Sequence, residues 1–139
     1  MGYTRENFEE WIILIPFKME YFTDIFAGEN NLKLDYSIES LDELENWILS
    51  NYKKVNDLIE DRKTLDYLTV YIGETFRKYI GGKWYIDLEN KKNVFYSMPV
   101  LTSPEYKGIT CKSPMIYATA SIDRQKGNHI STILKNSMK

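Results

Sequence analysis

The change of sequence pattern that decides the fold lies in the stretch Gly73-Glu74-Thr75-Phe76-Arg77-Lys78-Tyr79-Ile80-Gly81-Gly82-Lys83-Trp84. Up to Ile80, apolar residues recur at three- and four-residue steps, which indicates one face of a helix. Gly81 and Gly82 then predict the end of this helix, because glycine accepts the left-handed backbone that follows many helices. From Trp84 onward, apolar and polar residues alternate, which is typical of a strand. The stretch therefore predicts a corner at which a helix turns into a β-sheet.

The same stretch contains an ion pair and an unusual glycine. Glu74 can reach Arg77 at the i+3 position of the helix, so the two should pair. Gly73 in a helix interior costs about 1 kcal/mol relative to alanine, and close packing of another backbone would explain it. We interpret the motif as a structural junction. The alternative is a ligand pocket between this helix and the sheet, lined by Glu74, Arg77 and Tyr85.

The residues before the corner predict three helices. A first helix is capped by Thr4, is interrupted near Pro16 and stops at Gly28, because proline disfavours helical backbone before it. A capping box, Ser40 to Glu43, predicts the start of a second helix that continues to Ile59. The third helix starts at about Arg62 or Leu65 and ends at Gly81 and Gly82. The buried face expected for the first helix comprises Phe8, Trp11, Ile12, Ile15, Met19, Phe22 and Phe26.

The residues after the corner predict a small sheet and one or two further helices. A strand over 83–88 and a polar connector over 89–93 predict a hairpin, whose return strand spans 94–96 with a continuation to Leu101 left open. A short strand follows over 109–111. Ser113 and Pro114 predict a helix start, and Gly127 predicts its end. The predicted fold is a single α+β domain over residues 1–139: N-terminal helices on a small antiparallel sheet, with one or two C-terminal helices.

Composition predicts an intracellular protein without catalytic machinery. Cys111 is the only cysteine of 139 residues, so the chain has no internal disulfide, which fits the cytoplasm. The N-terminus lacks a signal-peptide pattern, and no apolar run reaches the ~20 residues of a membrane helix. His129 is the only histidine, and no nucleophile motif, phosphate-binding loop or metal-ligand spacing is present. We therefore predict a protein with no catalytic residue, metal or cofactor.

Charge is divided unevenly between the two halves of the chain. Residues 1–61 carry 14 acidic and 5 basic residues, a net charge of −9, whereas residues 62–139 carry a net charge of +7. The halves can neutralise each other in the fold, or the acidic half can meet a basic partner. The basic half is rich in aromatic residues, but it lacks the ribonucleoprotein motif and the pI is 5.5, so nucleic acid is not favoured.

The acidic half gives the first functional hypothesis, a protein-binding domain. The expected partner contacts are Asp35, Tyr36, Glu39, Asp42, Glu43, Glu45 and Tyr52. This hypothesis predicts an exposed acidic patch that contains aromatic anchors. The second hypothesis is a small-ligand-binding or enzymatic domain that uses the pocket near Glu74. The tyrosine content also leaves a homodimer open.

The pattern Gly-Glu-x-x-Arg-x-x-x-Gly-Gly-x-Trp, here residues 73–84, resembles one found in small uncharacterised bacterial proteins. Some of those proteins look like immunity proteins of bacterial toxin systems. The resemblance covers about residues 66–101 and implies a fold, but it transfers no catalytic residue. It implies that the partner could be a basic toxin domain, such as a nuclease. The acidic helices of residues 1–61 lie outside the resemblance.

Overall fold

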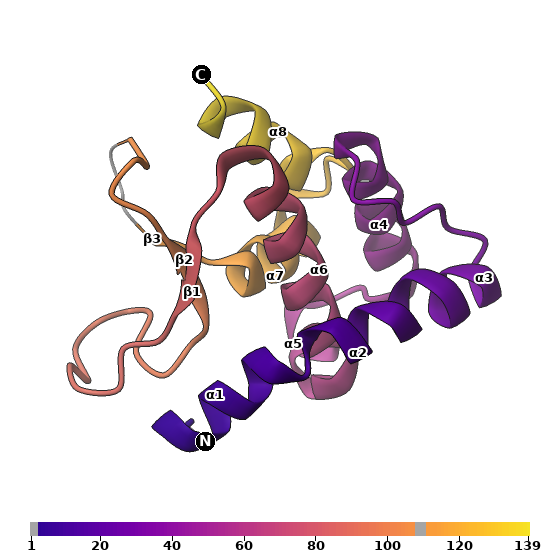
Figure 1. Cartoon of the computed structure of the whole chain (residues 1–139). Helices are drawn as coiled ribbons and strands as arrows, with labels where there is room; N and C mark the ends of the chain where they lie inside the picture. Colours follow the sequence, from indigo (N-terminus) through magenta and orange to yellow (C-terminus); the bar gives the residue numbers. More distant parts are fainter. Residues whose placement is uncertain (1–2, 108–110) are drawn as a thin grey trace.

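The computed structural model describes residues 3–107 and 111–139, and in this part of the chain it is an α+β fold (Figure 1). The helices are α1 (Arg5–Ile13), α2 (Ile15–Tyr21), η1 (Phe22–Phe26, a π-helix), α3 (Ala27–Glu29), α4 (Ile38–Asn51), α5 (Val55–Glu60), α6 (Arg62–Ile80), α7 (Pro114–Arg124) and α8 (His129–Ser137). The strands are β1 (Lys83–Tyr85), β2 (Val100–Thr102) and β3 (Cys111–Lys112). They form one antiparallel sheet in the order β1-β2-β3. The predicted fold class is confirmed.

The N-terminal helices form a bent rod along the lower edge of the molecule in Figure 1. Thr4 caps α1, since the backbone N–H of Asn7 donates to the Thr4 hydroxyl at 3.1 Å. The rod breaks at Leu14, and Pro16 lies in the first turn of α2, where a helix needs no donor. The predicted cap and the predicted interruption are both confirmed. Within the described residues, no helix is both long and apolar enough to cross a membrane.

The predicted start and length of the second helix are wrong. The cap of α4 is Ser37, whose hydroxyl accepts the backbone N–H of Ser40 at 3.1 Å. Ser40 lies inside the helix because its buried hydroxyl bonds to the Tyr71 hydroxyl at 2.6 Å. The helix also stops at Asn51 and does not continue into α5. Between them, Tyr52 is extended, and its hydroxyl donates to the carboxylate of Asp61 at 2.6 Å.

The predicted return strand over 94–96 is wrong, because β1 pairs with residues 100–102. The continuation to Leu101 overlaps this partner strand, and the strand predicted over 83–88 is limited to Lys83–Tyr85. The carboxylate of Asp87 accepts the backbone N–H groups of Glu89 and Asn90 and the side-chain amide of Asn93. The chain therefore folds around Asp87 and does not pair back along β1; a single parallel bridge joins Asp87 to Tyr96. The third strand exists as Cys111–Lys112, and the predicted residues 109 and 110 lie outside the described residues.

The core is built around α6, with α7 packed along it (Figure 1). Leu68, Tyr71, Ile72 and Phe76 of α6 are fully buried, and the connected core extends from Phe8 to Leu134. Ser113 caps α7 as predicted. The helix ends at Arg124, before the expected stop at Gly127, because Gln125 already adopts the left-handed conformation. Helix α8 packs against α4.

Candidate functional site

The corner at residues 73–84 is a set of interlocking contacts. The indole of Trp84 lies against Gly73: a Cβ at this position would be 2.1 Å from the ring. The indole N–H donates to Glu74 Oε2 at 2.8 Å. Arg77 donates through Nη1 to the same oxygen at 2.9 Å, and through Nε to the carbonyl of Gly82 at 3.1 Å. The glycine is therefore required by an aromatic side chain, and not by another backbone as expected.

Gly81 and Gly82, the two glycines of the corner, are held in place by the side chain of Tyr106. Both have positive φ angles, 70° at Gly81 and 111° at Gly82. The Tyr106 hydroxyl donates to the carbonyl of Gly81 at 2.6 Å, and a Cβ at Gly82 would meet that hydroxyl at 1.9 Å. These contacts give every distinctive residue of the motif a structural role, which favours the structural junction.

The alternative ligand pocket is only partly present. A shallow depression of about 340 Å³ is lined by Ile12, Ile15, Pro16, Glu74, Arg77, Lys83 and Trp84. Glu74 and Arg77 are locked to each other at its rim. Tyr85 does not line the depression and is 47% exposed on the surface. The structure thus brings together Glu74 and Arg77 but not Tyr85. The carboxylate of Glu74 already accepts hydrogen bonds from Arg77 and Trp84.

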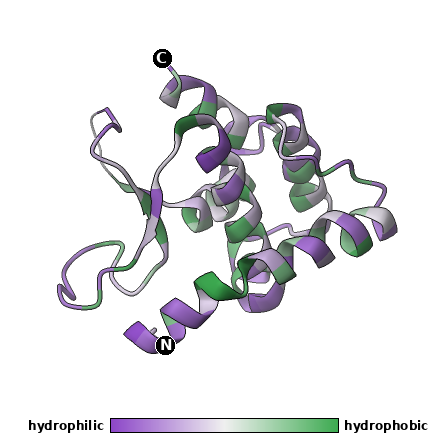
Figure 2. Ribbon diagram, viewed as in Figure 1, coloured by the Kyte–Doolittle hydropathy of each residue, from purple (hydrophilic) through white to green (hydrophobic). Residues whose placement is uncertain are grey.

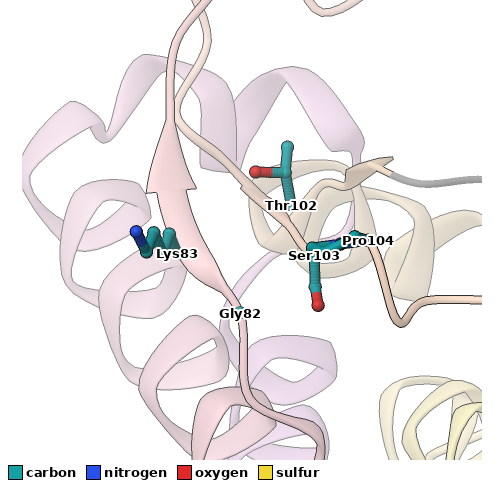
Figure 3. A pocket seen from close by; sticks show the side chains of 5 residues that line it. All are labelled: Gly82, Lys83, Thr102, Ser103 and Pro104. Carbon is teal, nitrogen blue, oxygen red and sulfur yellow. The ribbon is translucent and has the colours of Figure 1, made fainter.

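A second hollow lies beside the first residues of β1 and has a volume of about 520 Å³ (Figure 3). It is lined by Gly82, Lys83, Thr102, Ser103 and Pro104. In Figure 3 the Lys83 side chain extends away from Thr102 and Ser103, so the ammonium and the two hydroxyls do not converge. The Ser103 hydroxyl instead accepts the backbone N–H of Glu105 at 3.1 Å.

The predicted acidic partner face is divided by the fold. Asp35, Glu39 and Glu43 are exposed. Asp35 accepts the backbone N–H of Ser37, and this hydrogen bonding lowers the pKa of its carboxyl below the usual value. Glu43 accepts the backbone N–H of Lys33 at 3.1 Å. These three carboxylates remain available to a partner.

Two members of that face are used inside the molecule. Glu45 is fully buried, and its carboxylate accepts the backbone N–H groups of His129 at 3.0 Å and Ile130 at 2.8 Å. It therefore caps the N-terminus of α8, where a negative charge also suits the helix dipole. Asp42 is half-buried and accepts the hydroxyl of Ser131 at 2.6 Å. The prediction that Glu45 contacts a partner is corrected, because no partner can reach a fully buried side chain.

The two predicted aromatic anchors, Tyr36 and Tyr52, are half-buried. Tyr36 stacks on Tyr71 with ring centroids 5.0 Å apart, and burial raises the pKa of its hydroxyl. Burial, together with the hydrogen bond to Asp61, raises the pKa of Tyr52 to about 12. Both rings therefore support the fold, and the α4 face lacks the exposed aromatic anchors that the hypothesis requires.

The exposed apolar anchors lie instead on the N-terminal rod. Ile13 is 67% exposed and Phe17 is 69% exposed, and both belong to the α1–α2 junction, which is the green stretch of the rod in Figure 2. The acidic residues Glu6, Glu9, Glu10 and Glu20 are all exposed. In α1, three-, four- and seven-residue spacings place Glu6, Glu9, Glu10 and Ile13 on one side of the helix, and in α2 a three-residue step does the same for Phe17 and Glu20. We call these six residues the acidic–apolar ridge.

The sequence contained a signal for this ridge. The apolar run 11–17 includes both Ile13 and Phe17, but neither belongs to the periodic set Phe8, Trp11, Ile15 and Met19, which is buried. An apolar residue that falls off the buried stripe must face solvent or a partner. Ile12, which was expected to be buried, is 36% exposed beside the ridge.

The carboxylates of the ridge form no ion pair with any described residue. Across residues 3–107 and 111–139, ion pairs join only Lys18 to Asp66 and Arg77 to Glu74. The first pair joins a basic residue of the acidic half to an acidic residue of the basic half, and the second lies within the basic half. Within the described residues, no ion pair therefore joins a carboxylate of residues 1–61 to a basic side chain of residues 62–139. The ridge exposes two large apolar side chains among four unpaired negative charges.

Catalytic and metal chemistry finds little support in the described residues. No group of three or more His, Cys, Asp or Glu side chains in this part of the chain is arranged to hold a metal ion. His129 lies at the start of α8, and burial lowers the pKa of its imidazole. Its backbone N–H is bound to Glu45, so the residue serves the capping of α8.

Comparison with known proteins adds no assignment to this geometry. The chain matches no family model, no curated protein sequence and no solved structure. The functional argument therefore rests on the surfaces described above, and the acidic–apolar ridge is the candidate functional site.

Proposed function

We propose that this protein is a non-catalytic binding domain that recognises a basic protein through the acidic–apolar ridge. The observation that carries the proposal is the exposure of Ile13 and Phe17, about two thirds each, among unpaired carboxylates. Protein interfaces commonly place apolar or aromatic anchors at the centre and charged residues at the rim. The ridge has this arrangement along one face of α1 and α2.

The charges define the chemistry of the partner. Glu6, Glu9 and Glu10 precede Ile13 in α1 and Glu20 follows Phe17 in α2, so a complementary surface combines an apolar groove with lysine or arginine at its edges. Opposite charges speed the encounter of two proteins, and buried apolar anchors slow their dissociation. A helix that inserts its apolar residues into a groove is a common form of such recognition.

A second copy of the chain does not fit this surface well. In a two-fold dimer the same patch of both copies meets itself. Contact through the ridge would then bring two sets of carboxylates together, and like charges that face each other oppose binding. The ridge is therefore suited to a different, basic protein.

The small-ligand or enzymatic alternative is less well supported. The Glu74 carboxylate already accepts three hydrogen bonds, two from Arg77 and one from Trp84, and it is ion-paired with Arg77. A general acid or base must be able to reach the reacting group. The depression beside this pair is more consistent with a contact site than with a reaction site.

The test is affinity capture with the immobilised domain in an extract of the source cells, followed by binding measurements with the purified captured protein. Two double variants of the ridge are compared with the wild type. One combines Ile13→Ser and Phe17→Ser, and the other combines Glu9→Lys and Glu20→Lys. The matched control is Val94→Ser, since Val94 is 78% exposed outside the ridge. Substitutions of exposed side chains change the free energy of unfolding by no more than about 0.5 kcal/mol, so all variants should stay folded.

We expect a basic protein that binds the wild type and the Val94→Ser control but neither ridge variant. Its association rate should fall as the salt concentration rises, because salt screens the attraction of exposed charges. The proposal is wrong if the captured protein binds both ridge variants as tightly as the wild type, or if no protein distinguishes them.

A bacterial toxin domain is the partner that the resemblance of residues 66–101 favours. In that form of the proposal the domain acts in the cytoplasm as an immunity protein and covers a basic active surface of the toxin. If the captured protein is a nuclease, a stoichiometric amount of the wild-type domain should inhibit it. The Ile13→Ser, Phe17→Ser variant should inhibit it much less.

A further inference from the structure

The depression between the α1–α2 junction and the start of β1 is lined by residues of two different chemical kinds. Ile12, Ile15, Pro16 and Trp84 are its apolar and aromatic lining residues, from the α1–α2 junction and from β1. Arg77 of α6 and Lys83 of β1 are its cationic lining residues. Its volume of about 340 Å³ lies at the small end of the range of ligand sites, about 300–1,000 Å³, so it suits a side chain better than a cofactor.

The positive charges at this depression exceed the negative ones. Glu74 is its only acidic lining residue, and both carboxylate oxygens already accept hydrogen bonds from Arg77, one of them also from Trp84. Arg77 uses Nε and Nη1 in the corner, and its Nη2 has no hydrogen bond among the described residues. Lys83 is exposed and forms no ion pair in that same part of the chain.

We propose that this depression binds an apolar side chain of the partner protein together with an adjacent carboxylate. The apolar group would contact Ile12, Pro16 and Trp84, and the carboxylate would accept hydrogen bonds from Lys83 and from Nη2 of Arg77. Hydrogen bonds between two charged groups are stronger than neutral ones. A cationic group is excluded from the same place because the free charges there are positive.

The depression and the ridge would then bind two different parts of one partner protein, an acidic group and basic groups. Both use the α1–α2 junction, since Ile12 and Pro16 line the depression and Ile13 and Phe17 belong to the ridge. The ridge selects basic groups and the depression selects an acidic one, so the pair of sites fixes the orientation of the partner. A protein whose acidic group met the ridge and whose basic groups met the depression would be repelled by like charges at both sites. This inference rests on the proposed binding function.

The test uses three small probes that separate the apolar contribution from the charged one. N-acetyl-leucine carries both an apolar side chain and a carboxylate, N-acetyl-leucinamide lacks the charge, and N-acetylglycine lacks the apolar side chain. Each is titrated into the ¹⁵N-labelled protein, and the signals of the Trp84 indole and of the Ile12 and Lys83 amides are followed by NMR. Arg77 is left unchanged because it holds the corner together.

We expect saturable shifts at these signals with N-acetyl-leucine, and binding of the other two probes that is weaker by about tenfold, which corresponds to 1.4 kcal/mol. Lys83→Gln should weaken N-acetyl-leucine binding severalfold, whereas Lys91→Gln, which changes an exposed lysine outside the depression, should not. Equal binding of N-acetyl-leucinamide, or no saturable shift at these signals, overturns the inference. The titration needs no partner, so its failure leaves the ridge to be judged by the capture experiment.

Discussion

At the scale of single residues, the corner shows how one side chain determines its neighbours. The Trp84 indole occupies the space that a side chain at position 73 would need, and its N–H takes up one oxygen of Glu74. It also meets the ring of Trp11 edge-on, with centroids 4.9 Å apart. A single tryptophan thus joins α1, α6 and β1, which explains why a helix interior tolerates a glycine there.

Gly73→Ala should therefore destabilise the protein, although alanine is the better helix former. The new methyl group would have to displace the Trp84 ring, and overpacking of this kind costs about 1–3 kcal/mol. Gly28→Ala is the control, since nothing lies within 4 Å of a Cβ at that helical position. It should be neutral or stabilising by up to about 1 kcal/mol. Urea unfolding of both variants measures the difference.

A double-mutant cycle identifies the cause of that destabilisation. On a Trp84→Leu background, which removes the clashing ring, Gly73→Ala should cost much less than in the wild type. An equal cost on both backgrounds would show that the strain at position 73 does not come from Trp84.

At the scale of secondary-structure elements, buried polar groups decide where helices start. Ser40 is drawn into the core by Tyr71, so the cap of α4 moves to Ser37. Glu45, on the same helix, supplies the cap that α8 lacks in its own sequence, because Asn128 forms no side-chain cap bond there. Two helices far apart in the sequence are thus joined by one carboxylate.

Glu45→Ala should unfold α8 preferentially and lower the free energy of unfolding by about 3 kcal/mol. The substitution leaves the backbone N–H groups of residues 129 and 130 without their charged acceptor, and a hydrogen bond to a charged group is worth about 1.5–3 kcal/mol. Glu39→Ala, on the exposed side of α4, is the matched control and should change stability by less than about 0.5 kcal/mol.

Hydrogen exchange measures this effect within the element. The amides of α8 should exchange faster in Glu45→Ala than in Glu39→Ala, while those of α6 change less. If α8 stays as protected as in the wild type, Glu45 is not the group that holds its first turn.

At the scale of the whole molecule, the aromatic residues make stability depend on alkaline pH. Burial raises the pKa of Tyr52, Tyr71 and Tyr117 to about 12 each. The folded state therefore holds these protons more tightly than the unfolded chain, in which tyrosine has a pKa of about 10. Their contribution to stability is complete below pH 10 and is lost as the pH rises toward 12.

Tyr117→Phe should separate this alkaline effect from packing. The ring of Tyr117 packs on Phe76 with centroids 5.5 Å apart, and phenylalanine preserves this contact. We expect a urea midpoint close to the wild-type value at pH 7, and a smaller decrease of the midpoint between pH 9 and 11, in the rising part of the titration. An unchanged decrease would mean that Tyr117 ionises equally easily in both states.

The sequence by itself determined the succession of helices, sheet and helices and several helix boundaries. The helical period ending at Gly81, the cap at Thr4, the interruption near Pro16 and the start of α7 at Ser113 were all predicted, because they depend on local backbone chemistry. The ion pair of Glu74 with Arg77 was predicted for the same reason, since both residues lie on one helix turn.

Only the tertiary structure decided which polar residues remain free. The carboxylate of Asp87 accepts hydrogen bonds from the loop that follows it, so β1 pairs with residues 100–102. The periodicity of the sequence does not specify this long-range pairing. Glu45 and Glu39 are both carboxylates of one helix, yet contact with α8 buries one and leaves the other exposed. Ile13 of α1 and Phe17 of α2 are exposed because the core covers only the sides of these helices that carry Phe8, Trp11, Ile15 and Met19. Availability for binding depends on what packs against a residue, and that is fixed by the whole fold.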